Sequence, residues 1–311
     1  MIPDSQIHTP VLLKEILEVF DPQEGEVYID ATINGGGHAR TIAQKIGDEG
    51  KVIGIDWDRE IIDELRIKNQ ELGIKNIELA CGNYVEVTKI AEKFGITRVN
   101  GILFDLGFSS HHIEKSGRGF SFQRDEPLDM RYSPAQNALT AATIVNTWSA
   151  KELEKIFREY GEERYARQIA RAIVQNRTQK KIIRTGELVR ILLRRVPPRT
   201  TRIHPATRVF QALRIAVNSE LENIKTALDD AVSLLLPGGK LAVISFHSLE
   251  DRIVKDFFKE KKEILRALTK KPIRASEKAN AWAARLKETK ENPRARSARL
   301  RAAEKIRPTA Q

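Results

Sequence analysis

Strand and helix patterns alternate through the first 105 residues, and this alternation is the strongest constraint on the fold. Short apolar runs with the composition of strands are separated by segments with helical periodicity. Strands separated by helices of this length predict a parallel, doubly wound sheet of the α/β class. The expected strands lie at 26–32, 51–58, 76–82 and 99–107, and the expected helices at 38–46, 59–73 and 85–95.

The alternation stops after the fourth strand, and residues 109–205 have the pattern of a mostly helical insert. Ser149, followed three residues later by Glu152, forms a capping-box pattern that predicts the start of a helix. Another helix is predicted over 185–196, where two prolines end it. We therefore expect this stretch to form a second domain that recognises the substrate.

The strand and helix pattern resumes beyond the insert. One long helix is expected over 206–235, a turn at "PGG", a strand over 240–246 and a helix over 248–260. A second half of the sheet is therefore expected here. The predicted parts are the first part of the core (1–108), the helical insert (109–205), the second part of the core (206–270) and a basic C-terminal tail (271–311).

The composition excludes several classes of protein. No apolar run approaches the ~18 residues of a membrane span, and the N-terminal residues do not have the pattern of a signal peptide. Cys81 is the single cysteine, which excludes internal disulfides and a cysteine-based metal site. No group of His and Cys has the spacing of metal ligands, so we expect no metal. A cytoplasmic enzyme with no membrane partner is the expectation.

The positive charge is segregated along the chain. Residues 1–149 hold 15 Lys and Arg against 23 Asp and Glu, whereas residues 150–208 hold 16 against 6. Residues 209–260 hold 6 against 8, and residues 261–311 hold 16 against 5. Two basic blocks thus flank acidic or neutral parts of a chain whose net charge is +11. Segregated basic blocks are typical of proteins that bind a polyanion, here a nucleic acid.

The segment "DATINGGGH" (30–38) lies between the first strand and the first helix. Its glycines, Gly35, Gly36 and Gly37, allow a tight turn and a close approach of a ligand to the backbone. Asp56 ends the next strand, where a carboxylate can accept hydrogen bonds from both hydroxyls of a ribose. The combination predicts a nucleoside site, although such a turn can also be purely structural.

Two ligands are compatible with this loop. A dinucleotide needs its pyrophosphate at the helix N-terminus and usually the spaced G-x-G-x-x-G pattern, which is absent. S-adenosylmethionine has no phosphate, and Asp30 could pair with its ammonium group while it would repel a pyrophosphate. We therefore expect S-adenosylmethionine, with His38 closing over its amino-acid end.

The segment "ILFDLGFSS" places Asp105 at the carboxyl end of the fourth strand, where ligands of such sheets bind. The exocyclic amine of a nucleobase is a poor nucleophile because its lone pair is delocalised into the ring. A carboxylate that accepts its N–H can localise that pair, and an aromatic face can hold the base in line with the methyl donor. Asp105 and Phe108 supply both groups in four residues, similar to the Asp-Pro-Pro-Tyr tetrapeptide of DNA amino-methyltransferases. Phe108 in the core is the alternative.

With these residues in view, the chain resembles the bacterial 16S ribosomal RNA (cytosine-N4)-methyltransferases of the MraW/RsmH type. The resemblance implies a Rossmann-like S-adenosylmethionine-dependent core with an inserted helical domain. The matching stretches run almost end to end: "HTPVLLKE" (8–15), "DATINGGGH" (30–38), "GIDWD" (54–58), "DLGFSS" (105–110), "RGFSF" (118–122), "PLDMR" (127–131), "HPATRVFQALRIAVNSEL" (204–221), "LLPGGKLAVISFHSLEDRIVK" (235–255) and "NPRARSARLR" (292–301).

The resemblance also implies an activity and roles for single residues. It implies methylation of N4 of a cytosine in the decoding, or P-site, region of 16S rRNA, within the 30S subunit as the expected partner. Tyr84 would border the adenine, and Asp105 would lie by the adenine or the reacting centre. Cofactor contacts are further implied for Gly36, Gly37, His38, Asp56 and His112.

This chain departs from the family pattern at three places. Ile33 and Asn34 stand where the family usually has Phe-Gly, and Phe108 stands where it commonly has valine. His112 occupies the position of a glutamine that contacts the cofactor. Because histidine can still donate or accept one hydrogen bond, we expect cofactor binding to survive this change.

Ser245 and His247 in "SFHS" are expected to face the target base at a strand end. Methyl transfer from a sulfonium needs no strong base, so they are not interpreted as a nucleophilic pair. The residues leave three other functions open: a DNA cytosine-N4 or adenine-N6 methyltransferase, an NAD-dependent dehydrogenase and a non-enzymatic RNA-binding module. They also leave open which basic residues touch RNA and the oligomeric state, a homodimer included.

Overall fold

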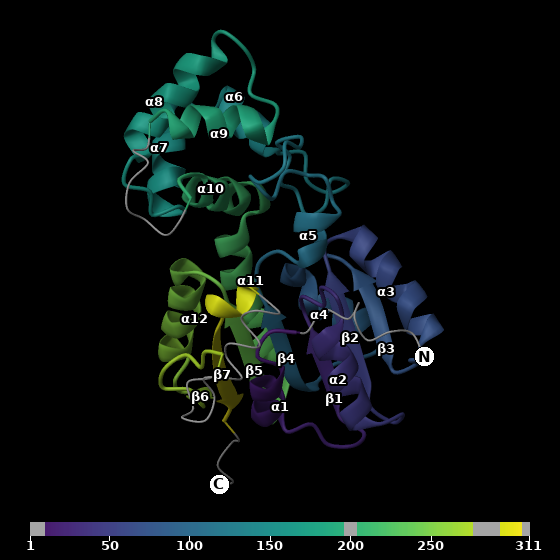
Figure 1. Cartoon of the computed structure of the whole chain (residues 1–311). Helices are drawn as coiled ribbons and strands as arrows, with labels where there is room; N and C mark the ends of the chain where they lie inside the picture. The colour runs from purple at the N-terminus through teal and green to yellow at the C-terminus, as the bar shows by residue number, and fades with distance from the viewer. Residues whose placement is uncertain (1–9, 196–203, 276–292, 307–311) are drawn as a thin grey trace. The chain divides into compact units, whose positions relative to one another are not determined.

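A computed structural model describes residues 10–195, 204–275 and 293–306, and it divides into two compact units (Figure 1). The first unit comprises Met1–Gly107 and Leu221–Gln311, and the second comprises Phe108–Glu220. The first unit contains a seven-stranded sheet in the order β3-β2-β1-β4-β5-β7-β6. Strands β1 to β5 are parallel, whereas β7 pairs antiparallel with both β5 and β6.

The elements of the sheet unit follow the predicted alternation. The expected α/β class and parallel sheet are confirmed, and each of the four early strands lies within its expected range. The strands are β1 (Val27–Asp30), β2 (Lys51–Asp56), β3 (Ile77–Cys81), β4 (Val99–Asp105), β5 (Leu235–Ser245), β6 (Leu265–Ala267) and β7 (Arg299–Lys305). The α-helices are α1 (Leu13–Phe20), α2 (Gly37–Ile46), α3 (Arg59–Glu71), α4 (Val87–Lys93), α11 (Glu220–Leu234) and α12 (Ser248–Glu260).

One hydrophobic cluster joins helices α1 and α2 to a face of the sheet. Tyr28 of β1, Val52 of β2 and Leu103 of β4 are buried in it together with apolar side chains of both helices. Burial of apolar surface at ~25 cal/mol per Å² makes this contact a main source of stability. The packing fixes the loop between β1 and α2, because both flanking elements are anchored in the same core.

The second unit consists of helices and a long irregular segment. Its described residues form α5 (Ser110–Glu114), α6 (Ala141–Thr147), α7 (Ala150–Glu159), α8 (Ala166–Arg177), α9 (Thr185–Leu193) and α10 (Ala206–Asn218). They share their own core, in which Phe157, Ile173 and Leu213 are fully buried. The predicted capping box is confirmed: Glu152 N donates to Ser149 Oγ, and Ser149 N donates to the Glu152 carboxylate at 2.7 Å.

The structure departs from the sequence-based expectation at three places where the chain returns from the insert. The helix expected over 206–235 is two helices, because Ser219 adopts a left-handed conformation with φ 51°. The insert was predicted to end at 205, but α10 packs its apolar face into the helical core, so the chain returns to the first unit at Leu221. The expected "PGG" turn lies within β5, whose pairing with β4 is irregular between Val99 and Gly101.

The C-terminal segment is also more ordered than a basic tail. Residues 299–305 form β7, which lies inside the sheet between β5 and β6. Its apolar side chains, among them Leu300, are buried between its neighbours, while Arg301 pairs with Asp251 at 2.7 Å. The remaining tail residues of the prediction, 276–292 and 307–311, lie outside the described residues. Among the described helices, none is long and apolar enough to cross a membrane.

Lys305 at the end of β7 provides a test of the assembled sheet. Its ammonium group donates to the carbonyls of Val232 and Leu235, both at 2.8 Å, at the carboxyl end of α11. Replacing Lys305 with Met leaves these carbonyls without their charged donor, and we expect a loss of ~1–3 kcal/mol in the free energy of unfolding. Urea unfolding measures this loss, with the exposed Lys259→Met as the matched control. Equal stability of the two variants would contradict the capping role of Lys305.

Candidate functional site

The candidate site lies where the strand order reverses. Strands β1 and β4 are neighbours, although β2 and β3 intervene in the chain, so the connections leave them in opposite directions. Asp30 ends β1 and Asp105 ends β4, and Asp56 ends the adjacent β2. In open α/β sheets, ligands bind outside the carboxyl ends of the strands at this switch point. All three predicted acids therefore reach the expected edge of the sheet.

Thr32 joins the ends of β1 and β4. Its hydroxyl accepts a hydrogen bond from the backbone N–H of Asp105 at 2.5 Å, and its own N–H donates to Asp30 Oδ1 at 3.3 Å. Ala31 N donates to the carbonyl of Leu103 at 2.9 Å, which continues the sheet pairing by one residue. These bonds fix the backbone of both acids in one register.

Asn34 extends this connection to β2. Its N–H donates to Asp56 Oδ2 at 3.1 Å, and its side-chain amide donates to the carbonyls of Thr32 at 2.8 Å and Asp105 at 3.3 Å. The residue adopts φ 48°, a left-handed conformation that glycine and asparagine tolerate best. Asparagine thus satisfies the backbone requirement at a position where the resembled family usually has glycine, and it adds a side-chain link between strands.

Ile33, the other departure in the loop, is explained by packing against Gly54 of β2. Ile33 is 3% exposed, and a Cβ atom at position 54 would lie 2.1 Å from its Cδ1. The large aliphatic side chain is therefore accommodated because the neighbouring strand has no side chain there. The departure at Ile33 is therefore explained by its packing against Gly54 of β2.

Gly36 is required by the turn itself. It adopts φ 73°, and a Cβ atom there would lie 2.8 Å from Arg40 Nη1. Arg40 is 8% exposed, and its Nη2 donates to the carbonyl of Gly35 at 2.8 Å. A Cβ atom on Gly35 would meet nothing within 4 Å, so the loop is open on that side. Gly37 is the first residue of α2.

Asp30 is held in an unusual electrostatic environment. Its side chain is 1% exposed, and burial raises its pKa to about 8, with the negative charges of Asp105 and Asp56 adding to the effect. Asp105 itself is 6% exposed. Carboxyl groups crowded in this way favour a bound cation, which would relieve both the burial and the mutual repulsion.

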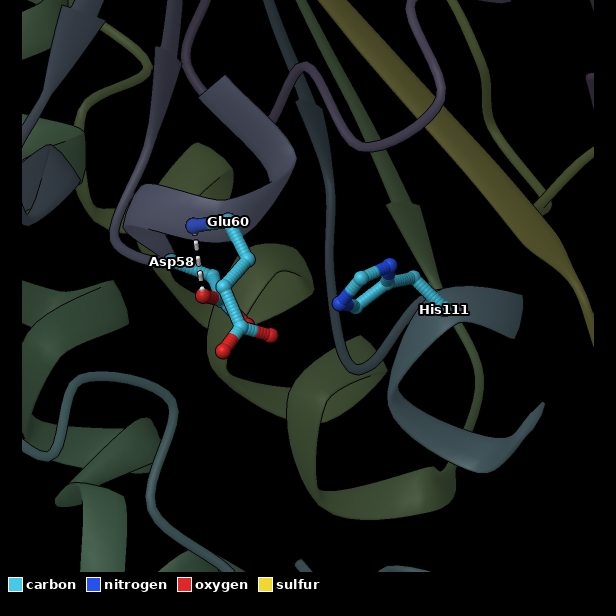
Figure 2. A group of neighbouring side chains, drawn as sticks. All are labelled: Asp58, Glu60 and His111. Carbon is cyan, nitrogen blue, oxygen red and sulfur yellow. Dashed lines mark hydrogen bonds between the residues drawn. The ribbon is translucent and has the colours of Figure 1, made fainter. Parts of the chain in front are cut away.

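Asp56 is oriented by the backbone around it. Asp56 Oδ1 accepts from the N–H of Asp58 at 2.9 Å, and its other oxygen accepts from Asn34. Asp58 caps α3, as its carboxylate accepts from Glu60 N at 3.1 Å (Figure 2). His111, drawn in the same view, belongs to α5 of the helical unit. The cap and the strand end together fix the direction of the Asp56 carboxylate.

Two other predicted cofactor residues lie in the sheet unit. Tyr84 begins a short 3-10 helix after β3 and packs edge-to-face on Phe104, with the ring centroids 5.6 Å apart. It is half-buried, and its contact with an adenine stays a prediction. His38 is 4% exposed, and its Nε2 lies 2.9 Å from the carbonyl oxygen of Val11. This contact anchors the segment before α1, a role that the sequence did not suggest.

The remaining predicted residues of the first unit lie at the end of β5 and directly after it. Ser245 is 2% exposed, and its hydroxyl donates to the carbonyl of Arg299 on β7 at 3.4 Å. His247 is the N-cap of α12, and its Nε2 lies 3.1 Å from Glu250 Oε1. Glu250 is 1% exposed, and its Oε2 accepts from the backbone N–H of Phe246 at 2.8 Å and of His247 at 3.2 Å. This geometry gives both predicted residues local structural contacts, and their contact with a base stays a prediction.

Phe108 and His112 belong to the helical unit. The guanidinium of Arg214 lies 4.6 Å from the centroid of the Phe108 ring, and it forms two hydrogen bonds with the Glu220 carboxylate at 2.8 and 2.9 Å. The rings of Phe108 and Phe120 stack with centroids 6.5 Å apart. His112 is 3% exposed, and its Nδ1 accepts from the N–H of Ser109. Both predicted residues are thus packed among aromatic and charged groups of this unit.

Sequence reasoning missed three residues that shape the site. Thr32 and Arg40 were not singled out, and Asn34 was only an unexplained departure. The signal for Asn34 was present, because asparagine before three glycines is typical of a left-handed turn position. No sequence pattern indicates that Arg40 turns back to the carbonyl of Gly35.

The residues of this edge fit S-adenosylmethionine, the ligand expected from the sequence. Asp30 and Asp105 are buried carboxylates next to an open glycine loop, and they would attract its positive centres. Asp56 is directed by backbone donors at a strand end, as a ribose-binding acid requires. A pyrophosphate would meet repulsion from the same carboxylates, which disfavours the dinucleotide.

Comparison with known proteins gives a match over nearly the whole chain. Residues 5–306 match the model of the MraW methylase family. A protein named ribosomal RNA small subunit methyltransferase H from Syntrophotalea carbinolica is 44% identical over 318 residues, covering 96% of this chain and 98% of that protein. Proteins of the same name from Thermomicrobium roseum and Dictyoglomus thermophilum are each 45% identical, covering 98% and 96% of this chain and 95% and 97% of their own lengths.

Two substitutions at Asn34 separate its backbone and side-chain roles. Asn34→Gly keeps the left-handed conformation but removes the amide bonds, whereas Asn34→Ala removes the bonds and adds strain of ~1 kcal/mol. We therefore expect thermal stability to fall in the order wild type, Gly variant, Ala variant. Calorimetric unfolding of all three proteins measures the order, and an Ala variant as stable as the Gly variant would refute the backbone role.

Proposed function

This chain belongs to the MraW methylase family, and from that membership we propose that it transfers a methyl group from S-adenosylmethionine to N4 of a cytosine in the decoding region of 16S rRNA. The observation that carries the proposal is the match of 96–98% of the chain to proteins named ribosomal RNA small subunit methyltransferase H. The three acids at the switch point of the sheet support it independently.

The loop after β1 and the end of β2 would hold the cofactor. When bound, S-adenosylmethionine supplies an electrophilic methyl group on a sulfonium. Gly36 allows the backbone turn, Asp56 would accept the ribose hydroxyls, and Asp30 would face a positive centre. Tyr84 would border the adenine from the next strand end. His38 contacts the carbonyl of Val11 and so connects the start of α2 to the segment before α1.

We propose that Asp105 orients the amine of the target cytosine. A carboxylate that accepts an N–H of the cytosine amine localises the nitrogen lone pair toward the methyl group. Thr32 holds the backbone N–H of Asp105, so the carboxylate starts from a fixed position. No strong base is required, since the methylated amine becomes acidic and loses its proton readily.

Phe108 follows Asp105 by three residues, and we propose that it positions the base. Its ring is restrained by Arg214 and Phe120, which would limit the movement of an aromatic wall. Flipped bases are commonly held by stacking on such rings. His112, which is fixed by Ser109 in the same unit, is proposed to contact the cofactor in place of the usual glutamine.

We propose that the substrate is 16S rRNA within the 30S particle. We also propose that the protein is located in the cytoplasm. The basic block of residues 150–208 lies within the helical unit and supports contact with RNA phosphates.

Transfer of a labelled methyl group tests the proposed function. The protein is incubated with labelled S-adenosylmethionine and with 30S particles, free 16S rRNA or DNA in separate reactions, and the modified nucleotide is mapped by nuclease digestion and mass spectrometry. The proposal predicts a label on N4 of a single cytosine in the decoding region. Label on another atom, or on DNA but not on rRNA, would assign a different amino-methyltransferase activity.

Asp105→Ala tests the assignment of the amine-orienting group. Loss of one positioned polar group at a reacting centre typically lowers kcat by about 10²–10³-fold. We expect that loss in single-turnover methyl transfer, with the melting temperature close to that of the wild type. A variant that methylates at the normal rate would remove Asp105 from the mechanism.

Phe108→Leu separates base positioning from packing, because leucine retains apolar volume but has no aromatic face. Loss of one base stack costs ~1–3 kcal/mol, so we expect a fall of at least about fivefold in kcat/KM for 16S rRNA. The affinity for S-adenosylmethionine should be unchanged. An unchanged kcat/KM with lowered thermal stability would leave Phe108 a packing residue only.

Asp30 predicts a pH dependence of cofactor binding. Its pKa of about 8 means that the carboxyl is protonated at neutral pH in the free protein, and a bound cation would favour the carboxylate. Binding should therefore release a proton, and affinity should rise from about pH 6 to about pH 8 and then level off. Calorimetry in buffers of different ionisation enthalpy measures the release. An Asp30→Asn variant with the same pH dependence would assign the proton to another group.

A further inference from the structure

A basic hollow of about 180 Å³ lies in the helical unit, where the end of α8 meets α9. Its floor is apolar, formed by Ile182 and Ile191, which are 2% and 8% exposed. Its rim is polar and carries more than one positive charge. The rim residues are Asn176, Gln179, Lys180, Lys181, Arg190 and Arg194.

Glu187 is the acid that lines this hollow, and its charge is already compensated. Its carboxylate accepts from Lys180 Nζ at 2.7 Å and from the backbone N–H groups of Ile183 at 2.9 Å and Arg184 at 3.1 Å. These donors lower the pKa of Glu187, so it remains ionised and bound to its own neighbours. Lys180 and Glu187 therefore cancel, and the other cations of the rim determine the charge.

Lys181, Arg190 and Arg194 are the cations that remain. All three side chains are exposed, and none forms an ion pair among the described residues. The charge of Arg190 contributes to lowering the pKa of Asp125, but the Asp125 carboxylate already accepts a hydrogen bond from Arg184 Nε at 2.9 Å. The hollow thus has a net charge of about three positive units and a shape that admits a small anionic group.

The spacing of these cations suits a chain of anions. Arg190 and Arg194 are four residues apart at the end of α9, so a rise of 1.5 Å per residue places them ~6 Å apart along the same helix face. Lys181 lies in the segment between α8 and α9 and lines the same hollow. A single carboxylate or phosphate would leave cations uncompensated, whereas successive phosphates of one strand could meet all three.

We propose that the hollow rimmed by Lys181, Arg190 and Arg194 binds consecutive backbone phosphates of the rRNA substrate. This inference rests on the proposed function, since it names the part of the helical unit that holds the RNA. The exposed amide of Gln179 adds an uncharged donor beside the cations. Phosphate contacts of this kind position a nucleic acid without reading its sequence.

The test compares two triple variants with the same change in net charge. The hollow variant is Lys181→Gln/Arg190→Gln/Arg194→Gln, and the control is Lys75→Gln/Lys93→Gln/Lys225→Gln, three exposed lysines of the sheet unit. Binding of 16S rRNA and of 30S particles is measured by filter retention at several salt concentrations. Circular dichroism and thermal melting show whether each variant is folded, and Arg190→Glu alone provides a less disruptive second variant.

We expect the hollow variant to bind 16S rRNA at least tenfold more weakly than the control near 0.1 M salt, an estimate that follows from losing two or three phosphate contacts. The slope of log K against log salt should fall by about 2, whereas the control should keep the wild-type slope. KM for 30S particles should rise, with kcat and the affinity for S-adenosylmethionine unchanged.

Two negative results have different meanings. If the hollow variant and the control bind 16S rRNA equally well, the inference is overturned, and an acidic protein becomes the candidate partner of this hollow. If the wild-type protein binds 16S rRNA through the hollow but transfers no methyl group to it, the proposed function fails while the phosphate site stands.

Discussion

The site depends on the placement of buried carboxylates at the point where the strand order reverses. Asp30 and Asp105 end neighbouring strands and are almost completely buried, and burial together with the negative charge of Asp105 raises the pKa of Asp30. Thr32 and Asn34 link the backbones of these strands by hydrogen bonds, which prevents the acids from moving apart. The burial of two acids side by side is tolerated because Asp30, whose pKa is raised to about 8, can remain protonated at neutral pH.

Much of this arrangement follows from the sequence, because strand ends are visible as apolar runs that stop at an acid. Asp56 and Asp105 could be placed on one edge of a parallel sheet from that pattern alone. The role of Asn34 could not, since its amide bonds a carbonyl 71 residues away and its backbone has a positive φ. The contact of His38 with Val11 also joins segments that no local pattern connects.

The errors in the second half of the chain have equally local causes. Helical periodicity continues on both sides of Ser219, so the left-handed residue that divides α10 from α11 is invisible in the pattern. Strand β7, "RLRAAEK", contains four charged residues and no β-branched residue, so its sequence has the composition of a basic tail. The spacing of Phe108 from Asp105 predicts a contact with the base. The motif does not predict the contact of the Phe108 ring with Arg214, because Arg214 is 106 residues away in the sequence.

The central claim is that this edge of the sheet is a cation-binding nucleoside site, and isothermal calorimetry with purified protein tests it most directly. S-adenosylmethionine and NAD are titrated separately into the wild-type protein and into Asp30→Asn. The account predicts saturable binding of S-adenosylmethionine, no binding of NAD and a weaker affinity for the variant, whose site lacks the carboxylate. Binding of NAD without binding of S-adenosylmethionine would contradict the account.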